Sequence, residues 1–173
     1  PQRFQVESFE GGLSDWKSFG DWYHTLNDTP GKLSQATKER LDMIKESSID
    51  EKDLCSRVYN FMQDKVRYVS IQFGIGGFKA MPVEDVDRLN YGDCKALSAY
   101  FKSMLSYVGV NSNYVLVKAG HFDTAFIASL PSNQFNHVLI AVPTGADSLF
   151  FECTNPLAPA AFNGSFTSSR KGL

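Results

Sequence analysis

The sequence lacks the features that mark several common protein classes. Its three cysteines, Cys55, Cys94 and Cys153, are too few and odd in number for a disulfide framework. It contains no run of lysines or arginines and its formal net charge is −2, so we expect no nucleic-acid interface built on phosphate contacts. No apolar stretch approaches the roughly 20 residues that cross a bilayer, so we expect no direct membrane insertion.

Motifs for metals and nucleotides are missing as well. No pair of histidines or cysteines has a ligand spacing such as C-x-x-C or H-x-x-x-H, so the sequence predicts no metal site. The glycine-rich stretch FGIGGF, residues 73–78, lacks both the Lys-Ser/Thr of a phosphate loop and the three-glycine dinucleotide spacing. We interpret it as a flexible loop beside a cleft and expect no cofactor.

What is present is typical of a globular domain. The chain has 173 residues, of which 43% are hydrophobic and 21% charged, enough for one substantial core. The N-terminal stretch PQRFQVESFEGG has no apolar central run and is not a signal peptide. Because the chain begins with a proline and stops at SSRKGL without completing a secondary-structure pattern, we expect a piece of a longer protein with other domains. The sequence does not indicate a cellular compartment.

The pattern of apolar residues predicts helices first and strands later. Helices are expected from Ser14 or Asp15 to Pro30, over 34–46, from about 50 to 65, over 83–89 and over 94–108. Strands are expected in RYVSIQF, NYVLVKA, FNHVLIAV and SLFFECT, with a hairpin turn in VPTGADS. The layout is α+β. We divide it into an N-terminal helical segment (1–48), a core (49–159) and a loosely attached tail (160–173).

Cys94 is the first candidate for chemistry. It follows Gly92 and Asp93 at the start of an apolar helical pattern, with Asp93 as a candidate cap. A thiol attacks as the thiolate, which a helix N-terminus and a neighbouring imidazolium both stabilise. The charge of Asp93 opposes the thiolate, so a cationic partner matters. The alternative is a buried, inert cysteine, because Cys94 continues the apolar stripe of its helix; we interpret Cys55 and Cys153 in that way.

His137 is the candidate partner, and strand register decides what it meets. If Thr144 and Gly145 are the two central residues of the hairpin turn, Glu152 lies directly opposite His137. With a loop longer by two residues the two side chains become diagonal neighbours on the same face. A register shifted by one residue separates them. In the first two cases Glu152 can orient the imidazole as the third member of a triad.

These residues carry a resemblance to a known family. The stretches YGDCKALSAYFKSMLSYVGVNSNYVLV, LPSNQFNHVLIAV and LFFECTNP resemble the transglutaminase-like superfamily of papain-type thiol enzymes, and among these the bacterial transglutaminase-like domains of longer, often exported proteins. The resemblance covers about residues 49–159. It implies a central helix packed on an antiparallel sheet, with Cys94 as nucleophile, His137 as general base and acid, and Glu152 where the family usually has aspartate.

The leading hypothesis is therefore a thiol-dependent acyl-transfer enzyme that hydrolyses a peptide or amide bond in a peptide or protein substrate; crosslinking is less favoured. The alternative is a catalytically silent binding or scaffold module. The Cys94 amide is a natural oxyanion donor, and Gln72, Tyr91 or Asn136 are candidates for a second donor or for the cleft wall. His24 and His121 are expected at the surface or in packing. Residues 120–134 form either a lid or a packed connection.

Overall fold

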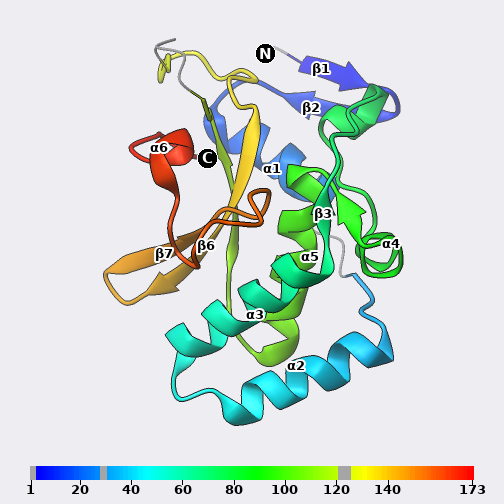
Figure 1. Cartoon of the computed structure of the whole chain (residues 1–173). Coiled ribbons are helices and arrows are strands. Elements are labelled where there is room, and N and C mark those ends of the chain that lie inside the picture. Colours follow the sequence, from blue (N-terminus) through cyan, green and yellow to red (C-terminus); the bar gives the residue numbers. More distant parts are fainter. Residues whose placement is uncertain (1–2, 28–30, 121–125) are drawn as a thin grey trace.

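The computed structural model describes residues 3–27, 31–120 and 126–173, which form an α+β arrangement, as predicted (Figure 1). The helices are α1 (Trp16–Asn27), α2 (Gln35–Ser47), α3 (Glu51–Lys65), α4 (Val83–Leu89), α5 (Cys94–Val108) and α6 (Gly164–Thr167), with a 3-10 turn at Gly74–Gly77. The strands are β1 (Arg3–Val6), β2 (Phe9–Gly12), β3 (Arg67–Tyr68), β4 (Tyr91–Gly92), β5 (Asn113–Val117), β6 (His137–Thr144) and β7 (Asp147–Phe151).

Helix α5 is the centre of the molecule. It packs against α2, α3, α4 and β6, and its residues are buried over most of its length. Its N-terminus is capped by Asp93, whose side chain accepts a hydrogen bond from the Ala96 amide at 3.0 Å. It ends at Gly109, whose φ of 91° is the left-handed conformation that favours glycine. Both bounds agree with the prediction, because both ends carry a capping residue.

The main sheet has three antiparallel strands in the order β5-β6-β7. Val117 pairs with His137 between β5 and β6, and Thr144 pairs with Asp147 where β6 turns into β7. The turn residues are therefore Gly145 and Ala146, with a φ of 70° at Gly145. Of the registers that the sequence left open, the one with Thr144 and Gly145 as turn residues is therefore not adopted.

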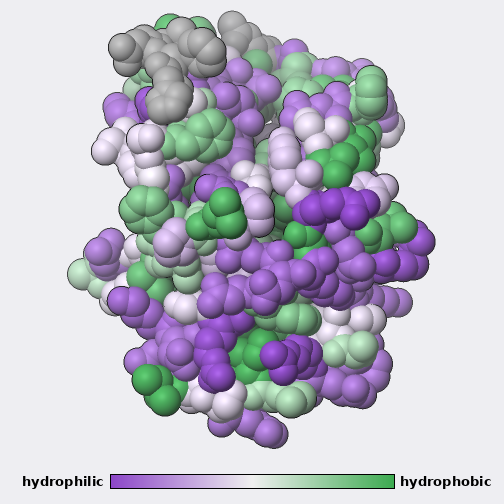
Figure 2. Space-filling model, in the orientation of Figure 1, coloured by the Kyte–Doolittle hydropathy of each residue, from purple (hydrophilic) through white to green (hydrophobic). Residues whose placement is uncertain are grey.

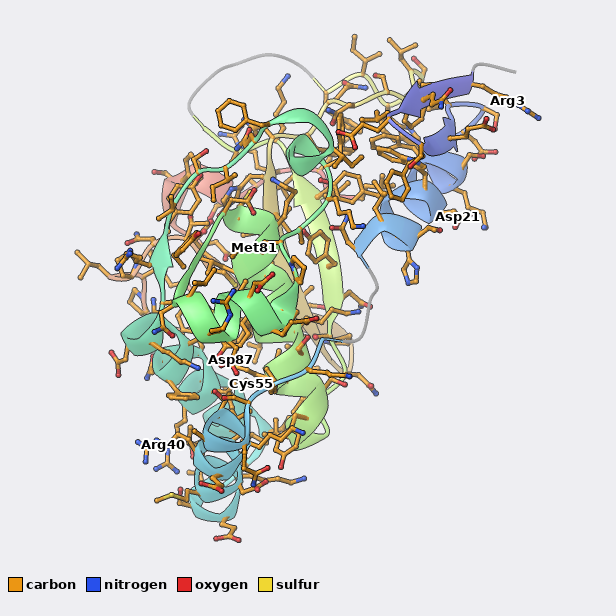
Figure 3. All side chains as sticks on the ribbon, turned by 90° about the vertical axis from the view of Figure 1, so that its right-hand side faces the viewer. Arg3, Asp21, Arg40, Cys55, Met81 and Asp87 are labelled. Atoms are coloured by element: carbon orange, nitrogen blue, oxygen red, sulfur yellow. The ribbon has the colours of Figure 1, made fainter. Side chains whose placement is uncertain are left out.

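The described residues form two hydrophobic cores, and α5 contributes to both. The larger one packs α2, α3, α4 and α5 against the inner face of β6 and β7. The second contains Phe19, Tyr23 and Leu26 of α1 together with Cys94 and Phe135. Figure 3 shows α1 and the strands that precede it at one end of the molecule, away from α2 and α3 at the other. Cys94 thus lies at the edge of the second core.

Two strand pairs lie outside the main sheet. The sequence analysis missed the antiparallel hairpin of β1 and β2, which precedes α1. In the predicted strand RYVSIQF, residues 67–73, only Arg67 and Tyr68 pair, in parallel with Tyr91 and Gly92. The remaining residues lead to the 3-10 turn at Gly74–Gly77. This stretch is shorter than predicted because β4 offers only two residues for pairing.

The C-terminal residues, expected as a loosely attached tail, are tied to the sheet. The backbone of Leu173 exchanges two hydrogen bonds with Leu116 of β5, at 2.9 and 3.0 Å, and Gly172 bridges Val117. Among the described residues no helix is both long and apolar enough to cross a membrane. On the face drawn in Figure 2, hydrophobic residues are scattered among hydrophilic ones rather than gathered in one patch.

Candidate active site

Cys94 lines a cavity of about 280 Å³ between the start of α5, the start of β6 and the segment around the 3-10 turn. Its side chain is almost fully buried, with 4% exposed. The predicted candidates Cys94, His137, Gln72 and Asn136 all line this cavity. The other lining residues are Tyr23, Gly77, Phe78, Lys95, Leu116, Asn133, Phe135 and Val138.

The start of α5 explains how the chain brings the thiol there. A Cβ atom placed on Gly92 would lie 2.8 Å from the Cβ of Ala96, so only glycine fits this close to the first turn. Asp93 then caps the helix, and Cys94 follows as its first residue. The backbone amide of Cys94 therefore belongs to the first turn, where amide groups have no partner one turn earlier in the helix.

His137 and Glu152 form the best-defined contact of the site. The Nε2 atom of His137 lies 2.7 Å from Oε2 of Glu152, and both side chains are buried. The other carboxylate oxygen of Glu152 accepts hydrogen bonds from the Thr154 amide at 2.8 Å and the Thr154 hydroxyl at 2.6 Å. Both carboxylate oxygens of Glu152 therefore make hydrogen bonds. Of the two ring nitrogens of His137, Nδ1 is the one that does not contact Glu152.

The register of the hairpin produces this contact diagonally. Ile140 pairs with Phe151, which puts Glu152, one residue beyond β7, opposite Leu139 rather than opposite His137. Side chains two residues apart along a strand point to the same face, so His137 and Glu152 remain neighbours. This is the diagonal arrangement that the sequence left open, reached by a shifted turn instead of a longer loop.

The electrostatics of the pair favour a charged imidazole. Burial disfavours the charged form of His137, but its interactions with the side chains of Cys94 and Glu152 outweigh burial and raise its pKa to about 9. For Glu152 burial acts in the opposite direction, and the hydrogen bonds from His137 and Thr154 still lower its pKa. At neutral pH the site thus holds an imidazolium beside a carboxylate.

Lys95 is a residue of the site that the sequence analysis missed. Its ammonium group forms an ion pair with Asp93, and both side chains are buried. Since Lys95 offsets the negative charge of Asp93 beside Cys94, the opposition that we expected from Asp93 is reduced. The sequence contains the signal for this ion pair, because Lys95 follows the first residue of the helix and is two residues from the cap residue Asp93.

Phe166 of α6 is a second residue that sequence reasoning missed. Its ring centroid lies 5.3 Å from that of the His137 ring, with the planes at 72°. The backbone carbonyl of Phe166 accepts a hydrogen bond from Gly120 at 3.0 Å, which fixes this part of the chain. No pattern in the polar C-terminal stretch indicated this contact, because it depends on how the chain returns to the sheet.

The three oxyanion and cleft candidates differ in their surroundings. Gln72 is exposed and lines the cavity. Asn136 also lines it, but its side-chain amide exchanges hydrogen bonds with the backbone of Ala119, at 2.7 and 3.0 Å. Tyr91 is not among the lining residues; its ring lies under the guanidinium of Arg67, 6.0 Å away. The geometry therefore favours Gln72 over the other two.

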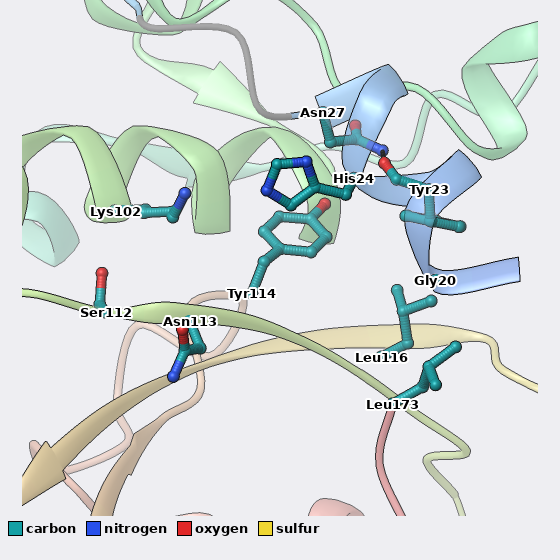
Figure 4. Close-up of a pocket in the computed structure, with 10 residues that line it drawn as sticks. All are labelled: Gly20, Tyr23, His24, Asn27, Lys102, Ser112, Asn113, Tyr114, Leu116 and Leu173. Atoms are coloured by element: carbon teal, nitrogen blue, oxygen red, sulfur yellow. Dashed lines mark hydrogen bonds between the residues drawn. The ribbon is translucent and has the colours of Figure 1, made fainter. Parts of the chain in front are cut away.

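Cys55, Cys153 and His24 are not among the residues that line this cavity. Cys55 is fully buried in the larger core, and burial raises its pKa to about 11. Cys153 is in the same core, where burial also raises its pKa. His24 faces a second cavity (Figure 4), and His121 lies outside the described residues. In the described part of the chain, no three His, Cys, Asp or Glu side chains gather in a group that could hold a metal ion.

The segment between β5 and β6 is packed where it is described. Phe126 stacks on Trp16 with ring centroids 5.2 Å apart, and the Trp16 indole donates a hydrogen bond to the Ala128 carbonyl at 2.6 Å. Of the two alternatives for residues 120–134, the packed connection fits the part from 126 onward. Residues 121–125 lie outside the described residues.

Comparison with known proteins shows a likeness of fold. No family model matches the chain, and neither does any curated protein. A solved structure from Parabacteroides distasonis, described as "a putative protease", matches 81% of this chain with a TM-score of 0.57 and 17% sequence identity. This chain spans 27% of that protein's length. The α+β fold of the chain is thus similar to part of a protein described as a protease.

Proposed function

We propose that the chain is a thiol-dependent acyl-transfer enzyme of the transglutaminase-like class that hydrolyses a peptide or amide bond. Cys94 is the nucleophile, His137 the general base and acid, and Glu152 the residue that orients His137. The observation that supports this most is the meeting of three distant parts of the chain: Cys94 and His137 line one cavity, and His137 is held by Glu152 at 2.7 Å.

In the proposed reaction Cys94 gives its thiol proton to His137, and the resulting thiolate sulfur attacks the carbonyl carbon of the scissile amide. A C–S bond forms and the electron pair of the C=O bond moves to oxygen. When the C–N bond breaks, the proton of the His137 imidazolium goes to the departing amine. Water then attacks the thioester carbon while His137 takes its proton, and the C–S bond breaks to release the acid. The pKa of about 9 at His137 keeps it charged for the first step.

The oxyanion that forms in this sequence needs hydrogen-bond donors. The amide of Cys94 is in the first turn of α5, and Gln72 is an exposed residue that lines the same cavity. Glutamate in place of the family's usual aspartate is compatible with the proposal. Its extra methylene is accommodated by the diagonal register, so that Oε2 still reaches Nε2 of His137.

The transglutaminase-like assignment rests on the sequence resemblance, and the structural likeness to a protein described as a protease supports hydrolysis. We extend the proposal to a peptide or protein substrate, to an exported bacterial protein of which this chain is one domain, and to catalysis without a cofactor. Crosslinking would need a site for an amine that also excludes water, and nothing in the cavity supports one.

Iodoacetamide labelling at different pH values tests the proposal. At pH 6 a free thiol is almost fully protonated, so an ordinary cysteine reacts slowly. We expect Cys94 to react at least about tenfold faster than glutathione at pH 6, and His137→Ala to remove that advantage. The label is assigned by mass spectrometry with Cys94→Ser as control. Cys55 and Cys153 are buried as Cys94 is, but they are not among the residues that line its cavity, and they serve as internal controls.

Labelling of Cys94 no faster than glutathione at pH 6 would overturn the enzymatic role. It would instead favour the second class of function, a silent transglutaminase-like binding module. A panel of peptide amides, assayed for amine release with wild type and Cys94→Ala, then identifies the bond that is cleaved. Release of amine by both proteins alike would contradict a role of the thiol.

A further inference from the structure

Glu152 lies just beyond the end of the sheet. The pairing of β6 with β7 ends at Ile140 and Phe151, one residue before Glu152. The two hydrogen bonds from Thr154 come from the same short stretch of chain, so Thr154 moves together with Glu152. These bonds shape the stretch locally, but they do not fix its place relative to the imidazole of His137. That task needs a contact from another element.

The side chain of Tyr59 in α3 makes such a contact. Its hydroxyl donates a hydrogen bond to the backbone carbonyl of Glu152. Tyr59 is fully buried, and its ring lies against those of Phe101 and Phe151, with centroids 5.6 and 5.4 Å away. The ring is thus fixed by α5 and β7, and the hydroxyl is directed to one place. A phenylalanine would fill the same space, so the hydroxyl provides something that packing does not require.

A second side chain of α3 holds the same stretch. Gln63 follows Tyr59 by four residues, so the two side chains lie on one face of the helix. The side-chain amide of Gln63 donates hydrogen bonds to the carbonyls of Asn155 and Ala158, at 3.0 and 2.9 Å. Helix α3 therefore contacts the chain at residues 152, 155 and 158. Since Tyr59 belongs to the larger core, that core is connected to the carboxylate of the candidate site.

We propose that Tyr59 is a positioning residue of this site, whose hydroxyl holds the backbone of Glu152 so that the carboxylate reaches Nε2 of His137. A hydrogen bond weakens steeply as its distance and angle depart from the optimum, so a small displacement of Glu152 loosens its hold on the imidazole. Burial raises the pKa of Tyr59, so its hydroxyl stays protonated and remains the donor. The inference deepens the proposed function, on which the catalytic meaning of the contact between His137 and Glu152 rests.

NMR titration of the His137 ring in Tyr59→Phe tests the proposal. The substitution keeps the ring and its packing and removes only the hydroxyl. We expect the pKa of His137 to fall from about 9 by about half a unit or more, because Glu152 stabilises the imidazolium less well. We also expect the labelling of Cys94 by iodoacetamide at pH 6 to slow at least about threefold.

Tyr100→Phe is the matched control. Tyr100 is also fully buried, and its hydroxyl donates a hydrogen bond to Asp87, which does not line the cavity of Cys94. Each substitution removes one buried hydroxyl and its hydrogen bond, so we expect each to lower the melting temperature by a few degrees. Only Tyr59→Phe should change the titration of His137. A tyrosine with a merely structural role at position 59 would behave as Tyr100 does.

Gln63→Met is a second, milder change in the same helix. It keeps the length of the side chain and removes both hydrogen bonds that Gln63 donates, so it should shift the His137 titration in the same direction by a smaller amount. It decides the question if Tyr59→Phe does not fold. The proposal is overturned if the pKa of His137 stays within about 0.2 units of wild type in Tyr59→Phe, or in Gln63→Met where that variant alone folds. An equal shift in Tyr100→Phe would overturn it as well.

The titration also separates this inference from the proposed function. It reports the contact between Glu152 and His137 and needs no reaction at Cys94. Slow labelling of wild-type Cys94 together with a shifted titration in Tyr59→Phe would contradict the nucleophile and support the positioning role of Tyr59. Fast labelling of wild type together with an unchanged titration in Tyr59→Phe would support the nucleophile and overturn the positioning role.

Discussion

At the scale of single residues, Glu152 sets the protonation of His137. Its carboxylate is buried and lies 2.7 Å from Nε2 of the imidazole. Replacing it by a neutral amide, Glu152→Gln, keeps the size of the side chain and removes the charge. We therefore expect the pKa of His137 to fall from about 9 by about one to two units, measured by NMR titration of the ring protons.

The matched control is Glu84→Gln, which removes a carboxylate from the exposed surface of α4 and should leave the His137 titration unchanged. Glu152→Asp keeps the negative charge and tests whether the length of the side chain matters. The side chain is shorter by one methylene, so we expect an intermediate pKa and a labelling rate of Cys94 between those of wild type and Glu152→Gln. An unchanged titration curve in Glu152→Gln would mean that the carboxylate does not hold the proton on His137.

The contact between His137 and Glu152 could be predicted from the sequence only in part. Given a two-residue turn at Thr144-Gly145 or at Gly145-Ala146, alternation along the strands puts His137 and Glu152 on one face, and the structure has them in contact. It does not fix the pairing, because Thr144-Gly145 and Gly145-Ala146 are both plausible two-residue turns. The left-handed φ of Gly145 suits the first turn residue of a primed hairpin, and this decided the register.

At the scale of elements, the start of α5 depends on Gly92. A Cβ atom on this residue would lie 2.8 Å from the Cβ of Ala96, which is fixed in the helix and cannot move aside. We expect Gly92→Ala to lower the free energy of unfolding by about 1–3 kcal/mol and to displace Cys94. Urea unfolding measures the first effect, and the iodoacetamide rate at pH 6 the second.

Gly77→Ala is the control for this change. An added Cβ at Gly77 would meet nothing within 4 Å, although the residue lines the same cavity. We expect its free energy of unfolding to stay within about 0.5 kcal/mol of wild type. If Gly92→Ala were as stable as Gly77→Ala, the close approach of Gly92 to the first turn would not be a constraint on the site.

A second element, the C-terminal stretch that includes α6, covers the imidazole. Phe166 is 44% exposed and packs on His137 edge to face, while Phe162 in the preceding turn is 58% exposed. We expect Phe166→Ala to lower the free energy of unfolding by about 1 kcal/mol, and Phe162→Ala to change it by less than half of that. Equal effects of the two substitutions in urea unfolding would contradict a specific contact with His137.

Elements differ in how well the sequence predicts them, for a physical reason. The bounds of α4 and α5 follow from local signals: Pro82 before one helix, and Asp93 and Gly109 at the two ends of the other. The hairpin of β1 and β2 was missed because its four-residue strands contain few β-branched residues and pack mainly against α1. The extent of β3 depends on β4, a partner more than twenty residues away.

At the scale of the whole molecule, the site is made by long-range packing. Cys94 comes from the central helix, His137 from the middle strand and Phe166 from the C-terminal stretch. The first two could be predicted because each sits at the start of an element with a strong pattern. The contacts of Phe166 and the second cavity beside α1 could not, since they depend on where segments without a clear pattern meet the sheet.

The same packing makes the stability of the whole protein depend on pH. Folding raises the pKa of His137 from 6.5 to about 9, so its contribution to stability is complete below pH 6.5 and is lost as the pH rises through about 9. Folding lowers the pKa of Glu152 from 4.5, so its contribution is present above that value and is lost as the pH falls below it. The pair therefore stabilises the fold most between about pH 4.5 and 6.5.

Urea unfolding between pH 6 and 9 measures this dependence. We expect the free energy of unfolding to fall by up to about 3 kcal/mol over this interval, because each pH unit between the two pKa values of His137 contributes about 1.4 kcal/mol. His137→Gln should be less stable than wild type at pH 6, and its free energy of unfolding should change little up to pH 9. The pKa of Cys55 is raised to about 11, so its titration lowers stability mainly above this range. A decline of equal size in wild type and His137→Gln would mean that His137 is not charged in the folded protein, and the proton that the proposed reaction delivers to the leaving amine would have no source.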